Sequence, residues 1–286
     1  MTFRNIGYSQ IAVVAIENET HAQVLNNNDT TENVNITLQI HETYVMEGMF
    51  DMTGTYIRAS AKVFVLTGNS KDKTPHSVGG SDSFHVCLVP YSHWGRQYYS
   101  FPPFNMTSWI AVKIMSWESK NITVVQWRNG TQVSSSTFEP NLTFEISKDL
   151  GKIESPKYIS AIQFAEPTSS KNVEDNADAL SMFLIPSFAQ FIRKYTVFPV
   201  FDISDVKNKA TYYINLVLPL GGRTTDLYIN NKTRIWQVVG SYSDGSTVVR
   251  FQLLPGDNLL ENRGHFNITA VVSASHEGLC YTFSLS

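Results

Sequence analysis

Residues 83–103, SFHVCLVPYSHWGRQYYSFPP, recur in altered form as residues 179–200, ALSMFLIPSFAQFIRKYTVFPV. Three aligned pairs mark the recurrence: Asp82 with Asp178, Pro90 with Pro186 and, after a slip of one residue, Tyr98 with Tyr195. A fixed internal period is the signature of a chain built from similar structural units, and here the period is about 95–100 residues. The sequence therefore predicts an array of modules.

Two further patterns extend the period in both directions. Apolar runs at 10–24, 109–125 and 213–229 each continue, after a short polar break, into a second β-rich run, which is a hairpin signal. Longer runs rich in β-branched residues follow at 54–68, 156–166 and 265–275, as expected for buried strands. We expect modules at 1–104 and 105–202, followed at 203–286 by a partial third module that lacks its own proline segment.

The fold class predicted from these patterns is all-β. Helical periodicity is nearly absent, and turn signals recur at strand-like intervals. Asn129-Gly130 predicts a type I′ hairpin, and Ser243-Asp244-Gly245 predicts another tight turn. Seven or eight short strands in each repeat, about the count of a β-sandwich module, favour tandem sandwiches. A β-propeller with two blades per repeat fits the same spacing and remains the alternative.

Composition limits the classes of function. The 286 residues include 42% hydrophobic residues, enough for a sizeable core, and only 16% charged residues with a net charge of −3. No segment of the chain is basic enough to bind along a phosphate backbone, so nucleic-acid binding is not expected. No apolar run approaches the ~18–20 residues of a membrane span. We expect no cofactor.

Nine Asn-x-Ser/Thr sequons stand out, against about four expected by chance from the abundance of Asn, Ser and Thr. The excess favours a glycosylated, secreted protein, although the opening residues lack the features of a signal peptide. We therefore expect a piece of a longer extracellular chain. The alternative is that an Asn- and Thr-rich β protein carries sequons by accident. The sequons lie at Asn18, Asn28, Asn35, Asn105, Asn121, Asn129, Asn141, Asn231 and Asn267.

The two cysteines leave two interpretations open. Cys87 and Cys280 both lie in apolar runs, in different modules. They fit either a disulfide between modules or two buried free thiols, because unpaired cysteine is among the most buried residue types.

No catalytic motif is present. The chain contains no G-x-S-x-G, H-E-x-x-H, C-x-x-C, G-x-G-x-x-G or Walker sequence, and its seven histidines lack metal-ligand spacing. We expect neither an enzyme nor a metal site. A hydrolase whose residues converge only in three dimensions is the least favoured alternative.

Two long polar segments, 67–82 and 166–178, fall at the same place in successive modules. Long loops on a rigid β framework often carry binding specificity. Within the first segment we predict a binding loop. The composition of both segments also fits flexible loops that only connect two strands. The candidate contact residues are Lys71, Asp72, Lys73 and His76.

The pair Trp94-Gly95 is predicted to be a structural anchor. A large ring would cover the core, and the glycine would supply a backbone angle that a Cβ resists. An exposed ligand platform is the alternative role for the ring.

Four segments together resemble the signature of the IgGFc-binding protein N-terminal domain family: 51–69, 82–103, 178–197 and 225–240. The resemblance covers essentially the whole chain in order. It departs from the family where Val86-Cys87 replaces a Glu-Gln pair, and in lacking the cysteines that often flank the variable loop. It implies a non-enzymatic domain of large secreted, often mucus-associated proteins or of bacterial surface proteins. The family's name records binding to the Fc part of IgG by one member.

We therefore expect an extracellular binding or scaffold module that recognises a protein or glycan through surface loops, with flanking modules in a longer chain. The alternative within the same resemblance is an immune-type receptor or adhesin with a defined ligand such as immunoglobulin Fc.

Overall fold

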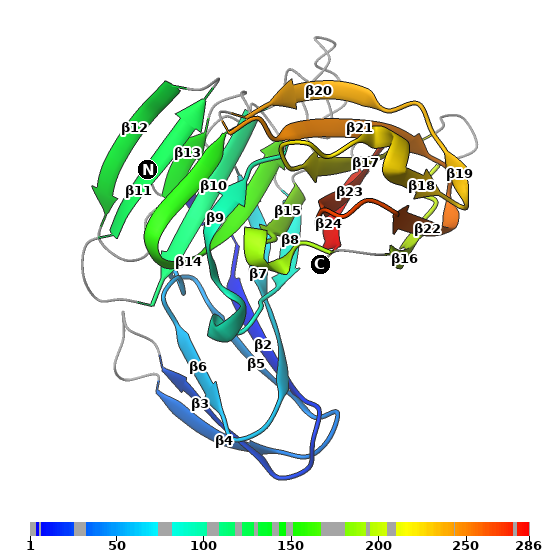
Figure 1. Cartoon of the computed structure of the whole chain (residues 1–286). Coiled ribbons are helices and arrows are strands. Elements are labelled where there is room, and N and C mark those ends of the chain that lie inside the picture. The colour runs from blue at the N-terminus through cyan, green and yellow to red at the C-terminus, as the bar shows by residue number, and fades with distance from the viewer. Residues whose placement is uncertain are drawn as a thin grey trace, which may run out of the picture. The chain divides into compact units, whose positions relative to one another are not determined.

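The computed structural model describes residues 4–5, 7–25, 33–73, 82–101, 109–117, 122–128, 131–138, 143–146, 151–166, 181–192, 195–204, 210–242, 244–276 and 279–285. These residues form antiparallel strands and short 3-10 turns, without an α-helix among them (Figure 1). The predicted all-β class is confirmed. The chain divides into two compact units, Met1–Tyr91 and Ser92–Ser286.

The first unit is a sandwich of two sheets. One sheet has the order β1-β7-β2-β5 with β8 on the other edge of β7, and the second has the order β4-β3-β6. Alternate residues of β2 and β3, including Val13, Ala15 and Val24, point into a shared apolar core. The strands are β1 (Arg4–Asn5), β2 (Ser9–Ala15), β3 (Thr20–Leu25), β4 (Val34–Leu38), β5 (Thr43–Gly48), β6 (Tyr56–Ala59), β7 (Val63–Lys73) and β8 (Asp82–Cys87).

The first unit is the first repeat, and the second unit contains the second and third repeats. The second repeat is built around one long strand, β14. Its residues 152–154 pair with β9 and β11, and its residues 159–166 pair with β10. A register shift separates the two parts near Pro156, where a missing amide is tolerated. The strands are β9 (Gly95–Tyr99), β10 (Trp109–Ser116), β11 (Ile122–Arg128), β12 (Thr131–Phe138), β13 (Thr143–Ile146), β14 (Lys152–Glu166) and β15 (Ser181–Ile185).

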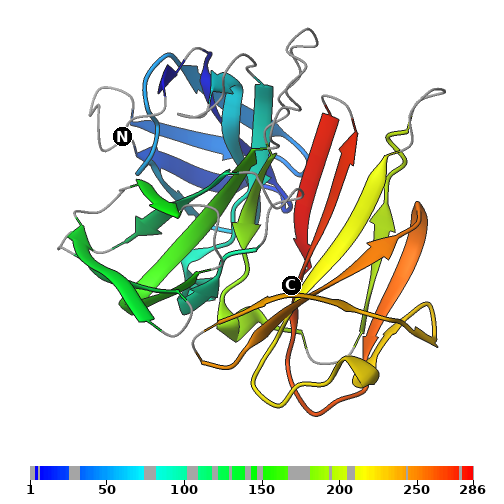
Figure 2. The same cartoon turned by 90° about the horizontal axis from the view of Figure 1, so that it is seen from above.

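The third repeat, like the first, has two sheets, which are ordered β16-β22-β18-β19 and β20-β21-β17-β23-β24 (Figure 2). Inward residues of both sheets, such as Phe198, Ile214 and Leu260, form one core. The strands are β16 (Tyr195–Val200), β17 (Thr211–Leu218), β18 (Leu227–Ile229), β19 (Lys232–Thr233), β20 (Gln237–Ser241), β21 (Thr247–Leu253), β22 (Gly256–Asn262), β23 (Thr269–His276) and β24 (Leu279–Leu285). A 3-10 turn, η4 (Thr224–Asp226), precedes β18.

The internal repeat is visible in the strand pairing. The order β5-β2-β7-β8 returns as β13-β10-β14-β15 and again as β21-β17-β23-β24. The same four-strand arrangement thus occurs three times, and the third repeat also has its last strand, β24. This recurrence is what tandem sandwiches require.

The two proline segments adopt the same local structure, as predicted. Pro90 lies between β8 and the turn η2 (Tyr91–His93), and Pro186 lies between β15 and the turn η3 (Phe188–Gln190). The segments then continue as β9 and β16, which pair with β14 and β22. By pairing, β9 and β16 belong to the repeat that follows them, whereas the boundaries predicted at 104/105 and 202/203 assign them to the repeat before. The reason is that an edge strand joins the sheet that offers it free backbone groups.

The anchor in the first proline segment differs from the prediction. Trp94 is only half-buried, and Gly95 has no positive φ. The residue that anchors the segment is Tyr98, which is 2% exposed. Its hydroxyl accepts a hydrogen bond from the Gly95 amide at 2.9 Å and donates one to the carbonyl of Ile159.

Gly95 is required for a close approach instead. A Cβ on Gly95 would lie 2.3 Å from the Cβ of Ser187 and 2.8 Å from its Oγ. Ser187 directly follows Pro186 and is buried, so the two proline segments are packed against each other. A single hydrogen atom in place of a side chain permits that contact.

Gly95→Ala is expected to lower the free energy of unfolding by about 1–3 kcal/mol, because overpacking forces the buried neighbours apart. Chemical denaturation measures the change. Ser187→Gly in the same chain removes both clashing atoms and should recover most of the loss. An alanine variant as stable as the parent, or a double variant no better than the single one, would contradict this account.

Candidate binding surfaces and the joint between repeats

The predicted binding loop begins later than expected. Lys71, Asp72 and Lys73 are the last residues of β7, where Asp72 pairs with Asn5 and with Asp82. The strand continues through a register shift after Asn69, whose side-chain oxygen accepts a hydrogen bond from the Lys71 amide at 2.9 Å. This hydrogen bond gives the Lys71 amide a partner at the bulge, and so the strand continues past it. His76 lies outside the described residues, as do 167–178 of the second polar segment.

Other predicted positions are placed only in part. Pro90 is exposed, Pro186 is buried, and Asp82 and Tyr195 lie in strands β8 and β16. Asp178 lies outside the described residues.

The sequons within the described residues all lie at the surface. Asn18, Asn35, Asn231 and Asn267 are exposed, including Asn267 next to the buried start of β23. Asn231 sits at the tip of the β18–β19 hairpin, where it and Asn230 have positive φ angles of 61° and 53°. The positions outside the described residues are Asn28, Asn105, Asn121, Asn129 and Asn141.

Two predicted turns can be followed through the residues that flank them. Arg128 of β11 pairs with Thr131 of β12, on either side of Asn129-Gly130, which lie outside the described residues. Tyr242 and Ser246 flank the second turn, and the Tyr242 amide donates to the Ser246 carbonyl at 2.8 Å. Cys87 carries a free thiol, and burial raises its pKa.

The second and third repeats meet at a buried joint. Side chains alternate along β17, so Ile214 and Leu216 face the core of the third repeat while Val217 faces away from it. Val217 is nevertheless completely buried, because it packs with Val248 and Val271 in the cluster that contains the core of the second repeat. The β17–β21–β23 part of the five-stranded sheet is therefore covered on both faces.

Aromatic residues from both repeats also fill this joint. Tyr99 of β9 lies 4.7 Å from Tyr242 in an edge-on arrangement and 6.0 Å from Phe191, as measured between ring centroids. The Tyr242 hydroxyl donates a 2.5 Å hydrogen bond to the Ser100 carbonyl. Aromatic pairs prefer particular ring orientations, so they fix the geometry of the joint in addition to burying apolar surface.

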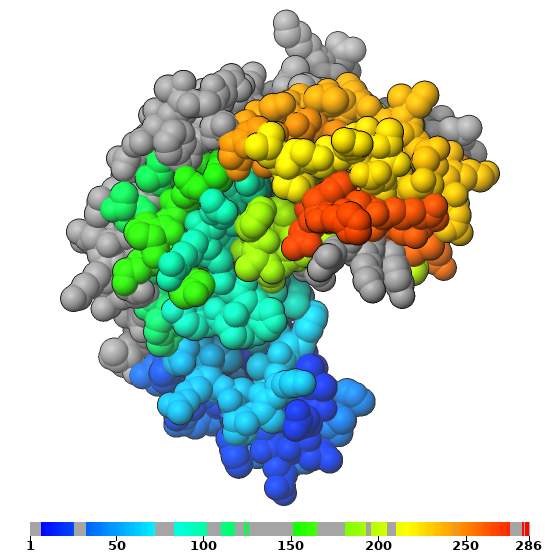
Figure 3. Space-filling view, viewed as in Figure 1, coloured from blue at the N-terminus to red at the C-terminus, as the bar shows by residue number. Residues whose placement is uncertain are grey.

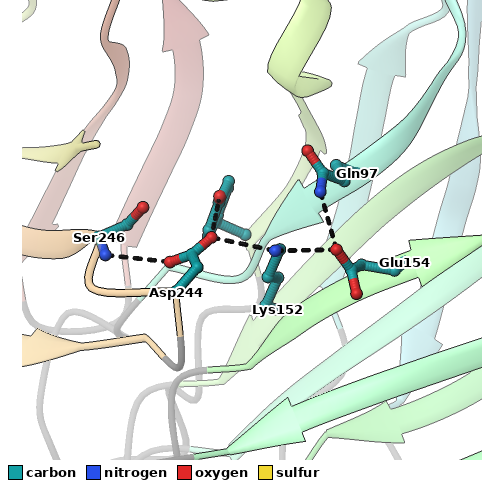
Figure 4. Close-up of polar contacts among 6 residues, drawn as sticks. Gln97, Lys152, Glu154, Asp244 and Ser246 are labelled. Atoms are coloured by element: carbon teal, nitrogen blue, oxygen red, sulfur yellow. Dashed lines mark hydrogen bonds and ion pairs between the residues drawn. The ribbon is translucent and has the colours of Figure 1, made fainter. Parts of the chain in front are cut away.

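A chain of polar contacts lines the same joint (Figure 4). Lys152 Nζ lies 2.8 Å from Glu154 Oε1 and 3.0 Å from Asp244 Oδ2. Asp244 also accepts hydrogen bonds from the Tyr99 hydroxyl at 2.6 Å and the Ser246 amide at 3.0 Å. Gln97 Nε2 donates to Glu154 at 2.7 Å. The lysine of β14 is thus shared between a strand neighbour and a turn of the next repeat.

These contacts set the ionisation of the group. Burial would raise the pKa of Asp244, but hydrogen bonds from Tyr99, Ser246 and Lys152 outweigh it and lower that pKa to about 2. Burial would lower the pKa of Lys152, but the two carboxylates outweigh it and raise the pKa above its ordinary value. Burial, with the bond to Asp244, raises the pKa of Tyr99. At neutral pH the lysine is therefore a cation and the aspartate an anion, which suits a structural ion pair and not a nucleophile.

A second buried polar pair lies further along the same outward face. Arg250 Nε donates to Asn215 Oδ1 at 2.7 Å, and the guanidinium lies 5.0 Å from the ring centroid of Tyr213. Both residues of the hydrogen bond are buried. A buried cation requires such partners, so this pair is part of the framework.

An open sheet face lies elsewhere on the third repeat. Along β16 and just beyond it, alternate residues Val197, Pro199 and Phe201 are exposed, and Val197 pairs with the half-buried Leu259 of β22. Leu254, just before β22, is 78% exposed. The chain around β22, orange to red in Figure 3, lies at the molecular surface in that view. Apolar side chains gathered on one sheet face are typical of an interaction surface.

Sequence reasoning did not find the joint. Tyr99 was hidden beside the repeated Tyr98, and Asp244 was recognised only as a turn residue. The available signal was Val217 in the run Ile214–Leu218, which places an apolar side chain on the face opposite Ile214, Leu216 and Leu218.

The family comparison agrees with the resemblance. The family model described as IgGFc binding protein matches residues 1–272, so the chain belongs to the IgGFc-binding family. A comparison with curated proteins returns no match. The family is one of binding domains, and the described part of the chain contains no cluster of three metal-ligating side chains. Within that part, no helix is long and apolar enough to cross a membrane.

Asp244→Asn is expected to lower the free energy of unfolding at pH 7 by about 2 kcal/mol, from the shift between an ordinary carboxyl pKa and about 2. The folded-state pKa is depressed, so this stabilisation is present above about pH 4 and is lost as the pH falls toward 2. Denaturation between pH 2 and 7 should show the parent and variant converging at the acid end. Asp257→Asn, which removes an exposed carboxylate, is the control and should shift stability by less than ~0.5 kcal/mol. A constant difference across the pH range would contradict the role of this carboxylate.

Proposed function

We propose that this chain is a non-enzymatic recognition module of a larger extracellular glycoprotein, and that it binds a protein or glycan partner. Membership of the IgGFc-binding family carries the proposal. The β framework supports it, because three apolar cores fix the strands from which the connecting segments project. Immunoglobulin Fc is the first ligand to test, because the family description names it.

Exposure of the described sequons supports the extracellular part of the proposal. A transferred glycan has room at Asn18, Asn35, Asn231 and Asn267. Peptide mass spectrometry of the chain secreted from a eukaryotic host tests this. Glycans at Asn35 and Asn267 are expected, and unmodified peptides at all four positions would contradict it.

The end of β7 from Lys71 onward, together with the segment that follows it, is the proposed recognition site. β7 and β14 hold the same place in their repeats, and a long polar connection leads from each to the next strand. Lys71 is exposed at the end of β7 and begins a run of three charges. Charged residues at a strand end can steer a partner, and their effect is screened by salt over about 8–10 Å.

Replacing Lys71, Asp72 and Lys73 together with Ser should leave the melting temperature within a few degrees of the parent, as surface changes usually do. Capture of immobilised IgG Fc, or of glycans on an array, should weaken at least fivefold, and added salt should weaken the parent in the same way.

Lys62→Ser, at an exposed position of the same unit, is the matched control and should bind as the parent does. A triple variant that melts normally and captures the same ligand as tightly as the parent would exclude this segment as the contact.

A further inference from the structure

The open face of the third repeat corresponds to the face that forms the joint in the second repeat. In the second repeat, Tyr99 pairs with Lys152 and Gln97 with Glu154. In the third, Val197 pairs with Leu259 on the outward face of the corresponding strands β16 and β22, whose inward residues Phe198 and Leu260 lie in the core. Tyr99 and Lys152 are buried under the next repeat, whereas Val197 is 66% exposed. Among the described residues, the third repeat therefore leaves exposed the face that is buried in the joint.

This exposed face is suited to an apolar contact. Val197, Phe201 and Leu254 are each more than half exposed. At its border, Arg263 forms a 2.8 Å ion pair with Glu261 and lies 3.8 Å from the ring centroid of Tyr228. An apolar centre with a polar border is the usual composition of a protein interface.

The first repeat presents the complementary half of the joint. The receiving face in the third repeat is formed by β17, β21 and β23, which correspond to β2, β5 and β7 in the first. On the outer face of those strands, Val45 pairs with Ala12, and Phe64 pairs with Val14. Val45 and Phe64 are 51% and 43% exposed, whereas Val217, Val248 and Val271 on the corresponding strands are buried.

We propose that two copies of this chain associate head to tail, with the β16–β22 face of one copy on the β2–β5–β7 face of the other. The contact would reproduce the joint between the second and third repeats. It is heterologous, since the two surfaces differ, so association continues into short linear chains and does not stop at a symmetric dimer. Because a standard interface buries about 1,600 Å² and the exposed apolar centre here is a few side chains, the association is weak and concentration dependent. The contact surfaces are distinct from the strand end proposed for ligand recognition.

Sedimentation velocity of the full chain over a concentration series tests the proposal. The parent should show an average mass that rises with concentration. Val197→Lys damages one face and Phe64→Lys the other, and both positions are exposed enough to accept the change without unfolding. Each variant alone should remain monomeric at concentrations where the parent associates. Its dissociation constant should be at least tenfold larger than that of the parent.

The decisive sample is an equimolar mixture of the two variants. Each retains the face that the other lacks, so the mixture should form a one-to-one pair with nearly the parent's affinity and no longer species. Ile235→Lys, at an exposed position between β19 and β20, is the control and should associate as the parent does. If Val197→Lys lowers the melting temperature, Phe201→Ser replaces it.

Three results would overturn the proposal. One is a parent that stays monomeric at millimolar concentration, which would leave the β16–β22 face for a different occupant. Another is association lost in Val197→Lys but retained in Phe64→Lys, which would indicate a symmetric dimer through the third repeat. The last is a mixture that does not pair.

Discussion

Burial of both faces of the β17–β21–β23 sheet is the constraint on which the second unit depends. One face covers the core of the third repeat, and the other, through Val217, Val248 and Val271, closes the core of the second. Apolar burial on both sides leaves no solvent boundary between the repeats, which explains why residues 92–286 form one compact unit. The polar contacts of Lys152 and Asp244 then help to fix the orientation, because their 3.0 Å contact allows little displacement of either partner.

The proline segments explain how the repeats are connected. Each segment leaves the last strand of one four-strand run, makes a single 3-10 turn and enters the companion sheet of the next repeat. Tyr98 and Gly95 hold the first crossing in place, and Ser187 of the second crossing packs directly against it. The resemblance between residues 83–103 and 179–200 therefore preserves a connection between repeats.

The sequence was sufficient for the fold class, the repeat and several turns. Alternating β-branched runs and turn dipeptides are local signals, and local signals determine strands and hairpins. The joint was not predictable in the same way. Lys152 meets Asp244 across 92 positions of sequence, and Tyr99 is distinguished from Tyr98 only by the face of β9 on which each lies. The anchor role was wrongly given to Trp94 because ring size indicates burial only on average, whereas the Tyr98 hydroxyl has two specific backbone partners. The binding residues remain a prediction, since most of the candidate segment lies outside the described residues.

Native-state hydrogen exchange, read by peptide mass spectrometry in increasing denaturant, tests the central claim most directly. If the joint merges the second and third repeats, the slowest amides of β10 and β14 should exchange with the same opening free energy and denaturant dependence as those of β17 and β23. Amides of β2 and β7, in the first unit, should follow a different opening. Separate opening free energies for β14 and β17, unchanged by Asp244→Asn, would show that the two repeats are independent and would contradict the account.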